Sequence, residues 1–146
     1  TSSIPWDDPS GTRLRQWLGV NEQEFYNTTN IGIVPMGFCY PGKGQSGDLP
    51  PRTECATTWM TRIREVMVNV SLTILIGTYA QKYFIPDNPY KTLTETVRNW
   101  HDFWPRYIVL PHPSPRNNIW LKKNAWFAEE VVPSLQEIVF NITKKQ

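Results

Sequence analysis

The chain has 146 residues, of which 40% are hydrophobic, 13% aromatic and 19% charged. This is a globular composition, and it excludes an intrinsically disordered chain, which would hold far fewer large apolar side chains. The 15 basic and 13 acidic residues give a net charge of +2, so a nucleic-acid-binding surface would have to be local. The longest apolar run, residues 72–77, is too short to span a membrane. The length predicts a single domain over residues 1–146.

Strand-like and helix-like patterns alternate along the chain. Three nearly continuous, β-branched-rich apolar segments are typical of buried strands: residues 31–34, 72–76 and 107–110. Apolar residues at helical spacing predict four helices: one after the start signal Asp8-Pro9-Ser10, then 53–67, 92–100 and 125–142. Strands alternating with helices predict an α/β fold of three layers, α/β/α, around a short, mainly parallel central sheet.

The loops after the predicted strands are the first places to look for a site, because open parallel sheets bind ligands beyond the carboxyl ends of their strands. That rule selects residues 35–40, 77–80 and 111–118. Proline and glycine concentrate in the first and third of these segments. Irregular, proline-restrained loops at strand ends are therefore the candidates for a functional site.

His112 lies in the third loop, directly after a predicted strand and between Pro111 and Pro113. Proline restricts the backbone on both sides, so the imidazole would be held in a defined position. A neutral histidine donates a hydrogen bond and can stabilise a developing oxyanion. The alternative interpretation is a histidine that only satisfies a loop carbonyl.

The segment around His112 is locally basic. No acidic residue occurs from Phe103 to Ala128, while the same stretch holds Arg106, His112, Arg116, Lys122 and Lys123. Interleaved with these are Asn117, Asn118, Trp120 and Trp126. Such a segment can contact phosphates, and it can equally be the solvated start of a basic helix.

Trp6 and the two cysteines complete the candidate residues. Trp6 follows Pro5 in a loop-like segment, where it can be a stacking platform for a base or an aromatic plug of the core. Cys39 and Cys55 are 16 positions apart and too few to complete a zinc or iron–sulfur site. On sequence alone they are two buried thiols.

Together these segments resemble the uracil-DNA glycosylase superfamily, and within it the iron–sulfur branch called family four. The run His112-Pro113-Ser114-Pro115 is similar to the closing motif of the superfamily. Pro5, Trp6 and Gly11 are similar in spacing to the family-four loop that stacks an aromatic ring on the flipped base. Cys39 and Cys55 are spaced like two cysteines of that branch, and residues 76–80 are similar to its Leu-Gly-x-x-Ala segment.

The chain also departs from the family pattern. The opening motif after the first strand and two further cluster cysteines are not present, and we expect them upstream of Thr1. Pro35 stands where the family places an asparagine that binds the amide edge of uracil. Proline has no side-chain donor or acceptor, so another base is an open alternative. Arg116 stands where the best-known branch has a leucine wedge.

The resemblance implies a DNA-repair glycosylase that hydrolyses the N-glycosidic bond of uracil or another deaminated base flipped out of DNA. In that interpretation His112 is catalytic and Trp6 stacks on the base. The remaining implied roles are base contacts by Met36, Gly37 and Phe38, DNA contacts by Ser114, Arg116 and Asn117, and cluster ligation by Cys39 and Cys55. The two cysteines would be half of the ligands of a 4Fe-4S cluster that this chain cannot complete.

Two other function classes stay open. One is a binding module that recognises DNA or a damaged base on a glycosylase fold without cleaving it. The other is an unrelated α/β enzyme or structural domain. The partner implied by the resemblance is DNA containing a damaged base, with no membrane and no second copy of the chain. Because no secretory signal begins the sequence, we expect a cytoplasmic protein.

Overall fold

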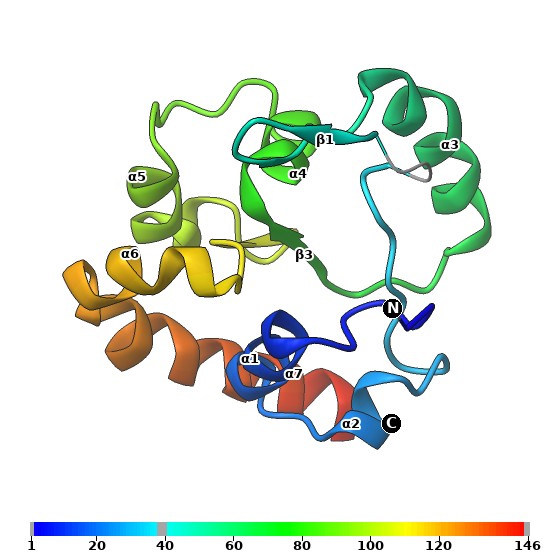
Figure 1. Cartoon of the computed structure of the whole chain (residues 1–146). Helices are drawn as coiled ribbons and strands as arrows, with labels where there is room; N and C mark the ends of the chain where they lie inside the picture. Colours follow the sequence, from blue (N-terminus) through cyan, green and yellow to red (C-terminus); the bar gives the residue numbers. More distant parts are fainter. Residues whose placement is uncertain (1, 38–40, 145–146) are drawn as a thin grey trace. The chain divides into compact units, whose positions relative to one another are not determined.

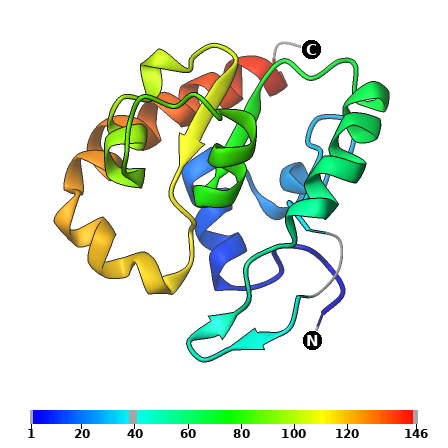
Figure 2. The same ribbon diagram turned by 90° about the horizontal axis from the view of Figure 1, so that it is seen from above.

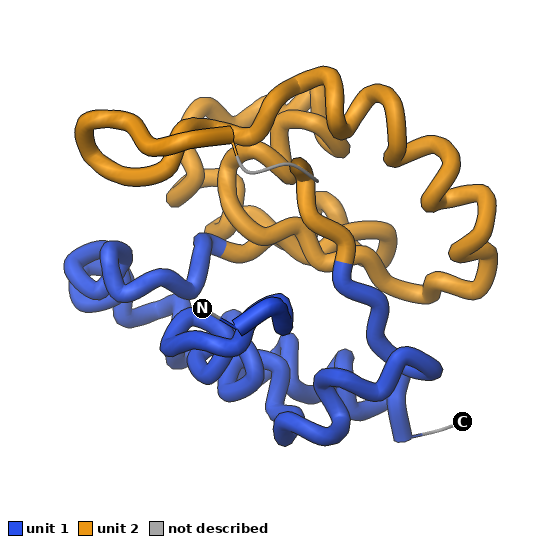
Figure 3. Tube along the Cα trace, turned by 45° about the vertical axis from the view of Figure 1, so that its right-hand side comes forward, with its two compact units in different colours: residues 1–33, 111–146 blue, residues 34–110 orange. Residues whose placement is uncertain are grey.

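A computed structural model describes residues 2–37 and 41–144. The chain divides into two compact units (Figure 3). Unit 1 combines residues 1–33 with 111–146, and unit 2 is the continuous stretch 34–110. The expectation of a single domain stays a prediction.

Unit 1 is built from helices. In chain order they are α1 (Pro9–Leu18), α2 (Glu22–Phe25), the 3₁₀ turn η2 (Pro115–Asn117), α6 (Asn118–Lys123), the π-helical turn η3 (Phe127–Val131) and α7 (Val132–Lys144). The predicted start signal of α1 is confirmed: the Asp8 side chain accepts a hydrogen bond from the Gly11 N–H at 2.8 Å, and Pro9 is the first helical residue. Gly19 ends α1 in the left-handed conformation, with φ 69°.

The core of unit 1 lies between α1 and α7, which run side by side in Figure 1. Leu14, Trp17 and Leu18 form the buried face of α1. The Trp17 ring meets the Phe127 ring edge-on, with 4.9 Å between the ring centroids. The Gln136 amide donates a hydrogen bond of 2.9 Å to the Gln16 carbonyl at the end of α1. These contacts hold the second half of α1, residues 14–18.

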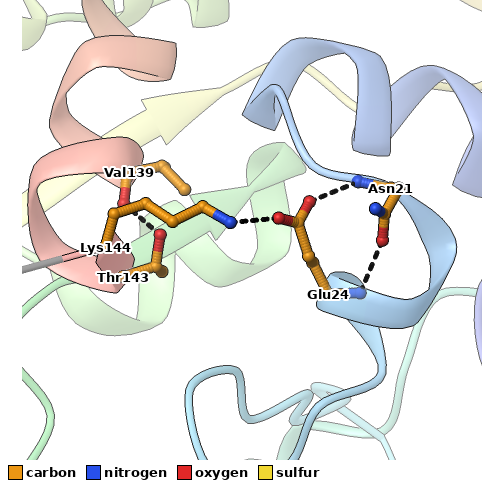
Figure 4. Close-up of polar contacts among 5 residues, drawn as sticks. All are labelled: Asn21, Glu24, Val139, Thr143 and Lys144. Atoms are coloured by element: carbon orange, nitrogen blue, oxygen red, sulfur yellow. Dashed lines mark hydrogen bonds and ion pairs between the residues drawn. The ribbon is translucent and has the colours of Figure 1, made fainter. Parts of the chain in front are cut away.

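The carboxyl end of α7 is connected to α2 (Figure 4). Asn21 and Glu24 form a capping box, in which each side chain accepts a hydrogen bond of 2.8 Å from the backbone N–H of the other. The second oxygen of Glu24 pairs with the Lys144 ammonium. The Lys144 contact, and then the Asn21 N–H, lower the pKa of the Glu24 carboxyl. Both side chains are well exposed, so the pair contributes little to stability.

Unit 2 contains the strands. In chain order its elements are β1 (Lys43–Gly44), β2 (Gly47–Asp48), α3 (Thr53–Val66), β3 (Thr73–Ile76), α4 (Gly77–Phe84), α5 (Leu93–Arg98), the 3₁₀ turn η1 (Trp100–Asp102) and β4 (Tyr107–Leu110). The short β1 and β2 form an antiparallel hairpin. β3 and β4 pair in parallel, with Thr73 opposite Tyr107 and Ile76 opposite Leu110, and lie side by side in Figure 2. The prediction of a mixed α/β chain with a small parallel sheet is confirmed.

The parallel pair forms the core of unit 2. Leu75 and the last three residues of β4 are almost completely buried. The buried Gln81 of α4 donates a hydrogen bond of 3.0 Å to the carbonyl of Leu110, the last residue of β4. An unpaired carbonyl in this buried position would cost about 1–3 kcal/mol, so Gln81 stabilises the point at which β4 ends.

Two predictions about secondary structure are wrong. Residues 31–34 form neither strand nor helix. Gly32 interrupts that apolar run, and Pro35 after it lacks the N–H that a sheet ladder needs. Residues 77–80, predicted as a loop, are the first turn of α4, because Gly77 adopts φ 82° and turns the chain directly from β3 into the helix. Within the described residues, no helix is both long and apolar enough to cross a bilayer.

Candidate active site

Unit 1 brings Trp6 and His112 together, although they are 106 positions apart in the sequence. Their ring centroids are 5.4 Å apart and their planes are tilted by 32°. Trp6 is only partly buried, whereas Trp17 of the core is 8% exposed. Trp6 is therefore less buried than a core tryptophan such as Trp17, and the interpretation of Trp6 as an aromatic plug of the core fits it less well.

The spacing of the two rings limits how a flat ligand can bind. A base sandwiched between them would need about 7 Å, twice the usual carbon–carbon contact distance. The observed 5.4 Å is too short for that arrangement. A base can instead stack on Trp6 beside the imidazole and meet the edge of His112. The pair combines a stacking surface with a hydrogen-bond donor.

The Trp6 backbone adopts an unusual conformation, with φ 62°. This left-handed geometry costs a residue with a side chain about 1–2 kcal/mol. Two contacts hold it: Arg15 donates to the Trp6 carbonyl at 3.1 Å, and the Tyr26 hydroxyl donates to the Pro5 carbonyl at 2.7 Å. The Trp6 backbone also lies against Gly11, where an added Cβ would be 1.7 Å from the Trp6 oxygen. Only glycine fits at that position of α1.

The loop of His112 is held equally firmly. The flanking Pro111 and Pro113 are both fully buried. The Asn117 side chain donates to the His112 carbonyl at 2.7 Å. Arg13 donates to the carbonyls of Pro113 and Ser114, at 3.4 and 3.3 Å. The backbone that carries the imidazole is thus restrained on both sides.

The hydrogen bonds of the imidazole indicate which nitrogen holds its proton. Burial lowers the pKa of His112 below its ordinary value of 6.5, against the opposing charge of Asp8. This direction favours the neutral ring. The Ser114 N–H donates to Nδ1 at 3.2 Å, which assigns the single ring proton to Nε2. His112 accordingly presents an N–H donor, the form suited to a developing negative charge on a ligand oxygen.

We expect the pKa of His112, followed by NMR of its Cε1 proton, to lie below 6.5 in the folded protein. Because the folded chain then binds fewer protons than the unfolded chain, this group lowers stability as the pH falls from 6.5 toward the folded pKa. Asp8→Asn keeps an N-capping side chain and removes the opposing charge, so it should lower the pKa further. A midpoint at or above 6.5 would contradict the neutral donor.

Other predicted DNA-contacting residues lie in the same loop and the following turn. Ser114 is the N-cap of η2 and accepts a hydrogen bond of 3.2 Å from the Arg116 N–H. Arg116 is exposed on η2, and Lys122 and Lys123 are exposed in the last turn of α6. The Asn117 amide donates to the His112 carbonyl, so this side chain helps to hold the loop. Contact with DNA stays a prediction for all of them.

The predicted base-contacting residues of the first loop belong to unit 2. Met36 and Gly37 are partly buried there. Gly37 lies close to Pro51, since an added Cβ would be 3.1 Å from the proline Cβ. Phe38 lies outside the described residues. Their contact with a base is untested.

The cysteines do not fit a complete iron–sulfur cluster. Cys55 is partly buried in the first turn of α3, and Cys39 lies outside the described residues. Two thiolates are half of the four ligands that a 4Fe-4S cluster takes. In the part of the chain that the structure describes, no three His, Cys, Asp or Glu side chains gather in a way that could hold a metal. Cluster binding by Cys39 and Cys55 stays a prediction.

Arg13 and Arg15 were not identified from the sequence, although both contact the loops of the site. Their partners are backbone carbonyls, which every residue has, so the sequence does not indicate which carbonyl an arginine contacts. The available signal was weaker: two arginines occur in a short amphipathic helix that starts three residues after Trp6.

One comparison with known proteins bears on this site. The family model described as the uracil DNA glycosylase superfamily matches residues 1–136. The match includes Trp6, Gly11 and the whole His112 loop. It also includes all of unit 2 and ends within α7. A match of this extent supports a glycosylase-type hydrolase acting on DNA, and the chain belongs to the uracil DNA glycosylase superfamily.

Proposed function

We propose that this protein is a DNA-repair glycosylase that hydrolyses the N-glycosidic bond of uracil or another deaminated base flipped out of DNA. The main support is the pairing of Trp6 with a neutral, N–H-donating His112 at 5.4 Å on two restrained loops. An enzyme that removes a base needs both functions, because the base must leave the stack and must then accept negative charge.

Binding begins with the flipped nucleotide. A base inside a duplex is out of reach, so the nucleotide rotates outward and its base stacks on the Trp6 ring. Stacking on an aromatic side chain contributes about 1–3 kcal/mol per base, which offsets part of the lost base stacking. The exposed Arg116 and the lysines of α6 supply positive charge for the flanking phosphates.

The chemical step breaks the bond between C1′ of the sugar and the base nitrogen. The electron pair stays with the base, and positive charge develops on the sugar. His112 donates its Nε2 proton in a hydrogen bond to a base oxygen and stabilises the departing anion. A water molecule then adds to C1′ and releases a proton to solvent. The chain supplies the stacking surface and the donor, while the water supplies the oxygen of the product.

A second candidate function is recognition of a damaged base or of DNA without cleavage. Pro35 favours this alternative, because it stands where the family has an amide side chain and offers no side-chain hydrogen bond. A module of this kind would keep the stacking surface of Trp6 and the positive charge of Arg116, Lys122 and Lys123. It would bind DNA without turnover.

The deciding experiment is a base-excision assay with labelled oligonucleotides that each contain one uracil, hypoxanthine or xanthine. We expect release of at least one of these bases and none from undamaged DNA. Binding to the same oligonucleotides should weaken steeply as the salt concentration rises, because phosphate contacts release counterions.

The two candidate functions give different results in this assay. No release of any base together with salt-sensitive binding would reject the glycosylase and support the recognition module. Neither release nor binding would reject both. The oligonucleotides should be tested as single strands and duplexes, because a flipped nucleotide costs less in a single strand.

A further inference from the structure

Helix α1 contacts both loops of the candidate site through two arginines. Arg13 and Arg15 are two residues apart, so they project about 200° from each other around the helix axis. Arg13 contacts the His112 loop and Arg15 contacts the Trp6 loop. The same short helix is therefore connected to the donor and to the stacking ring.

Arg13 uses one nitrogen, Nη1, for two backbone carbonyls of the His112 loop. The distances are 3.4 Å to Pro113 and 3.3 Å to Ser114, the two residues that follow the histidine. The side chain is partly buried, so these carbonyls are not simply solvated. Charged donors make stronger hydrogen bonds than neutral ones, and the long separation in sequence makes this contact specific to the folded unit.

Arg15 is held in place before it reaches the Trp6 loop. Its guanidinium carbon is 5.4 Å from the Phe25 ring centroid and 5.9 Å from that of Tyr26. From there Arg15 donates to the Trp6 carbonyl at 3.1 Å. Tyr26 adds a second restraint on the same loop through the Pro5 carbonyl. The left-handed Trp6 backbone is thus held from the side of α1 and α2.

The helix between these contacts is itself immobilised. Asp8 caps its first turn, Gly11 fits against the Trp6 backbone, and Leu14, Trp17 and Leu18 are buried. A guanidinium on a DNA-binding surface is normally directed at phosphate oxygens. Here both guanidinium groups are partly buried and directed at main-chain carbonyls, which is the arrangement of a structural support.

We propose that Arg13 and Arg15 are positioning residues that set the distance between His112 and Trp6, so that the donor and the stacking ring act on one base. The kinetic consequences of this proposal rest on the proposed glycosylase function. The claim that the two arginines set the distance between the rings does not depend on that function. Arg13 acts through the His112 loop and controls mainly the chemical step. Arg15 acts through the Trp6 loop and controls mainly binding of the base.

The test compares Arg13→Gln and Arg15→Gln with Arg13→Lys and Arg15→Lys. A misplacement of about 1 Å costs about 100-fold in rate, so we expect Arg13→Gln to lower kcat about 10- to 100-fold with little change in KM. Arg15→Gln should instead raise KM about 10-fold, as expected for partial loss of base stacking. Arg13→Lys should recover part of the loss, because one ammonium can donate to both carbonyls.

Lys144→Gln is the matched control. It also removes one positive charge from unit 1, but Lys144 is the last residue of α7 and its ion pair is with Glu24, not with the Trp6 or His112 loop. NMR adds a readout that needs no turnover: the contact between the Trp6 and His112 ring protons should weaken in both glutamine variants and persist in the control. Kinetic effects no larger than those of Lys144→Gln, with an unchanged ring contact, would overturn the proposal.

Two further outcomes are distinguishable. Equal losses of DNA affinity in both glutamine variants, with a shallower salt dependence and an intact ring contact, would identify the arginines as phosphate contacts and reject the positioning role. If the wild-type protein releases no base, the glycosylase proposal fails on its own. The ring contact then still decides whether Arg13 and Arg15 hold the two loops.

Discussion

Replacing His112 by alanine is expected to lower the rate of base excision about 100- to 1,000-fold, equivalent to about 2.7–4 kcal/mol of transition-state stabilisation. The variant loses the hydrogen-bond donor that we propose to stabilise the departing base. Binding of damaged DNA should change little, because Trp6 and the exposed basic residues are unaffected. The measurement is a single-turnover rate on the oligonucleotide that the wild-type protein cleaves.

The chain offers a matched control for this variant. His101, the other histidine, is exposed in unit 2 and stacks on Trp100 with 3.8 Å between ring centroids. His101→Ala should leave the excision rate within about twofold of the wild type. An equal loss of rate in both variants, or none in His112→Ala, would remove His112 from the mechanism.

Replacing Gly11 by alanine is expected to destabilise the protein by about 1–3 kcal/mol, the usual cost of overpacking. In most helices the same change is stabilising by about 0.5–1 kcal/mol, so the sign is diagnostic. The reason is the 1.7 Å that would separate the new Cβ from the Trp6 carbonyl oxygen. Either α1 or the Trp6 loop must move, and base excision should fall with it.

Urea unfolding measures the first effect and the excision assay measures the second. Gln16→Ala is the control, because Gln16 is exposed on the same helix and its hydrogen bond to Gln136 uses the backbone carbonyl. That variant should change the free energy of unfolding by no more than about 0.5 kcal/mol. A stabilised Gly11→Ala protein with full activity would show that Trp6 does not depend on this close approach.

The elements with strong local signals were predictable. Asp8 and Pro9 marked the start of α1, and the β-branched runs marked β3 and β4 almost to the residue. The helix at the end of the chain was also predictable, although its π-helical turn, η3, was not. These signals are local, because caps and apolar periodicity act within a few residues.

Predictions failed where the deciding interaction was not local. Residues 31–34 have the composition of a strand, but a strand also needs a partner, and the following Pro35 cannot complete a ladder. Gly77 looked like a loop residue, yet its positive φ is what allows α4 to follow β3 without a loop. In both cases the composition was compatible with two structures.

The candidate site was predictable in part. Sequence motifs indicated Trp6 and His112 as candidate residues. No spacing rule, however, predicts that two rings 106 positions apart in the sequence lie 5.4 Å apart in the structure. The contacts of Arg13 and Arg15 were not predictable, because a carbonyl acceptor is present at every residue. The motifs therefore indicated the groups that we propose to contact a base, and the structure was needed to find the groups that hold them.

The division of unit 1 between the two ends of the chain has a consequence for synthesis. Unit 2 is one continuous segment, so all of its residues are synthesised before those of the His112 loop. Trp6 and α1 precede unit 2 in the chain, whereas His112 and α7 follow it. Trp6 and His112 can therefore come together only after the whole of unit 2 has been synthesised between them. A nascent chain truncated before His112 contains the stacking ring but lacks the hydrogen-bond donor.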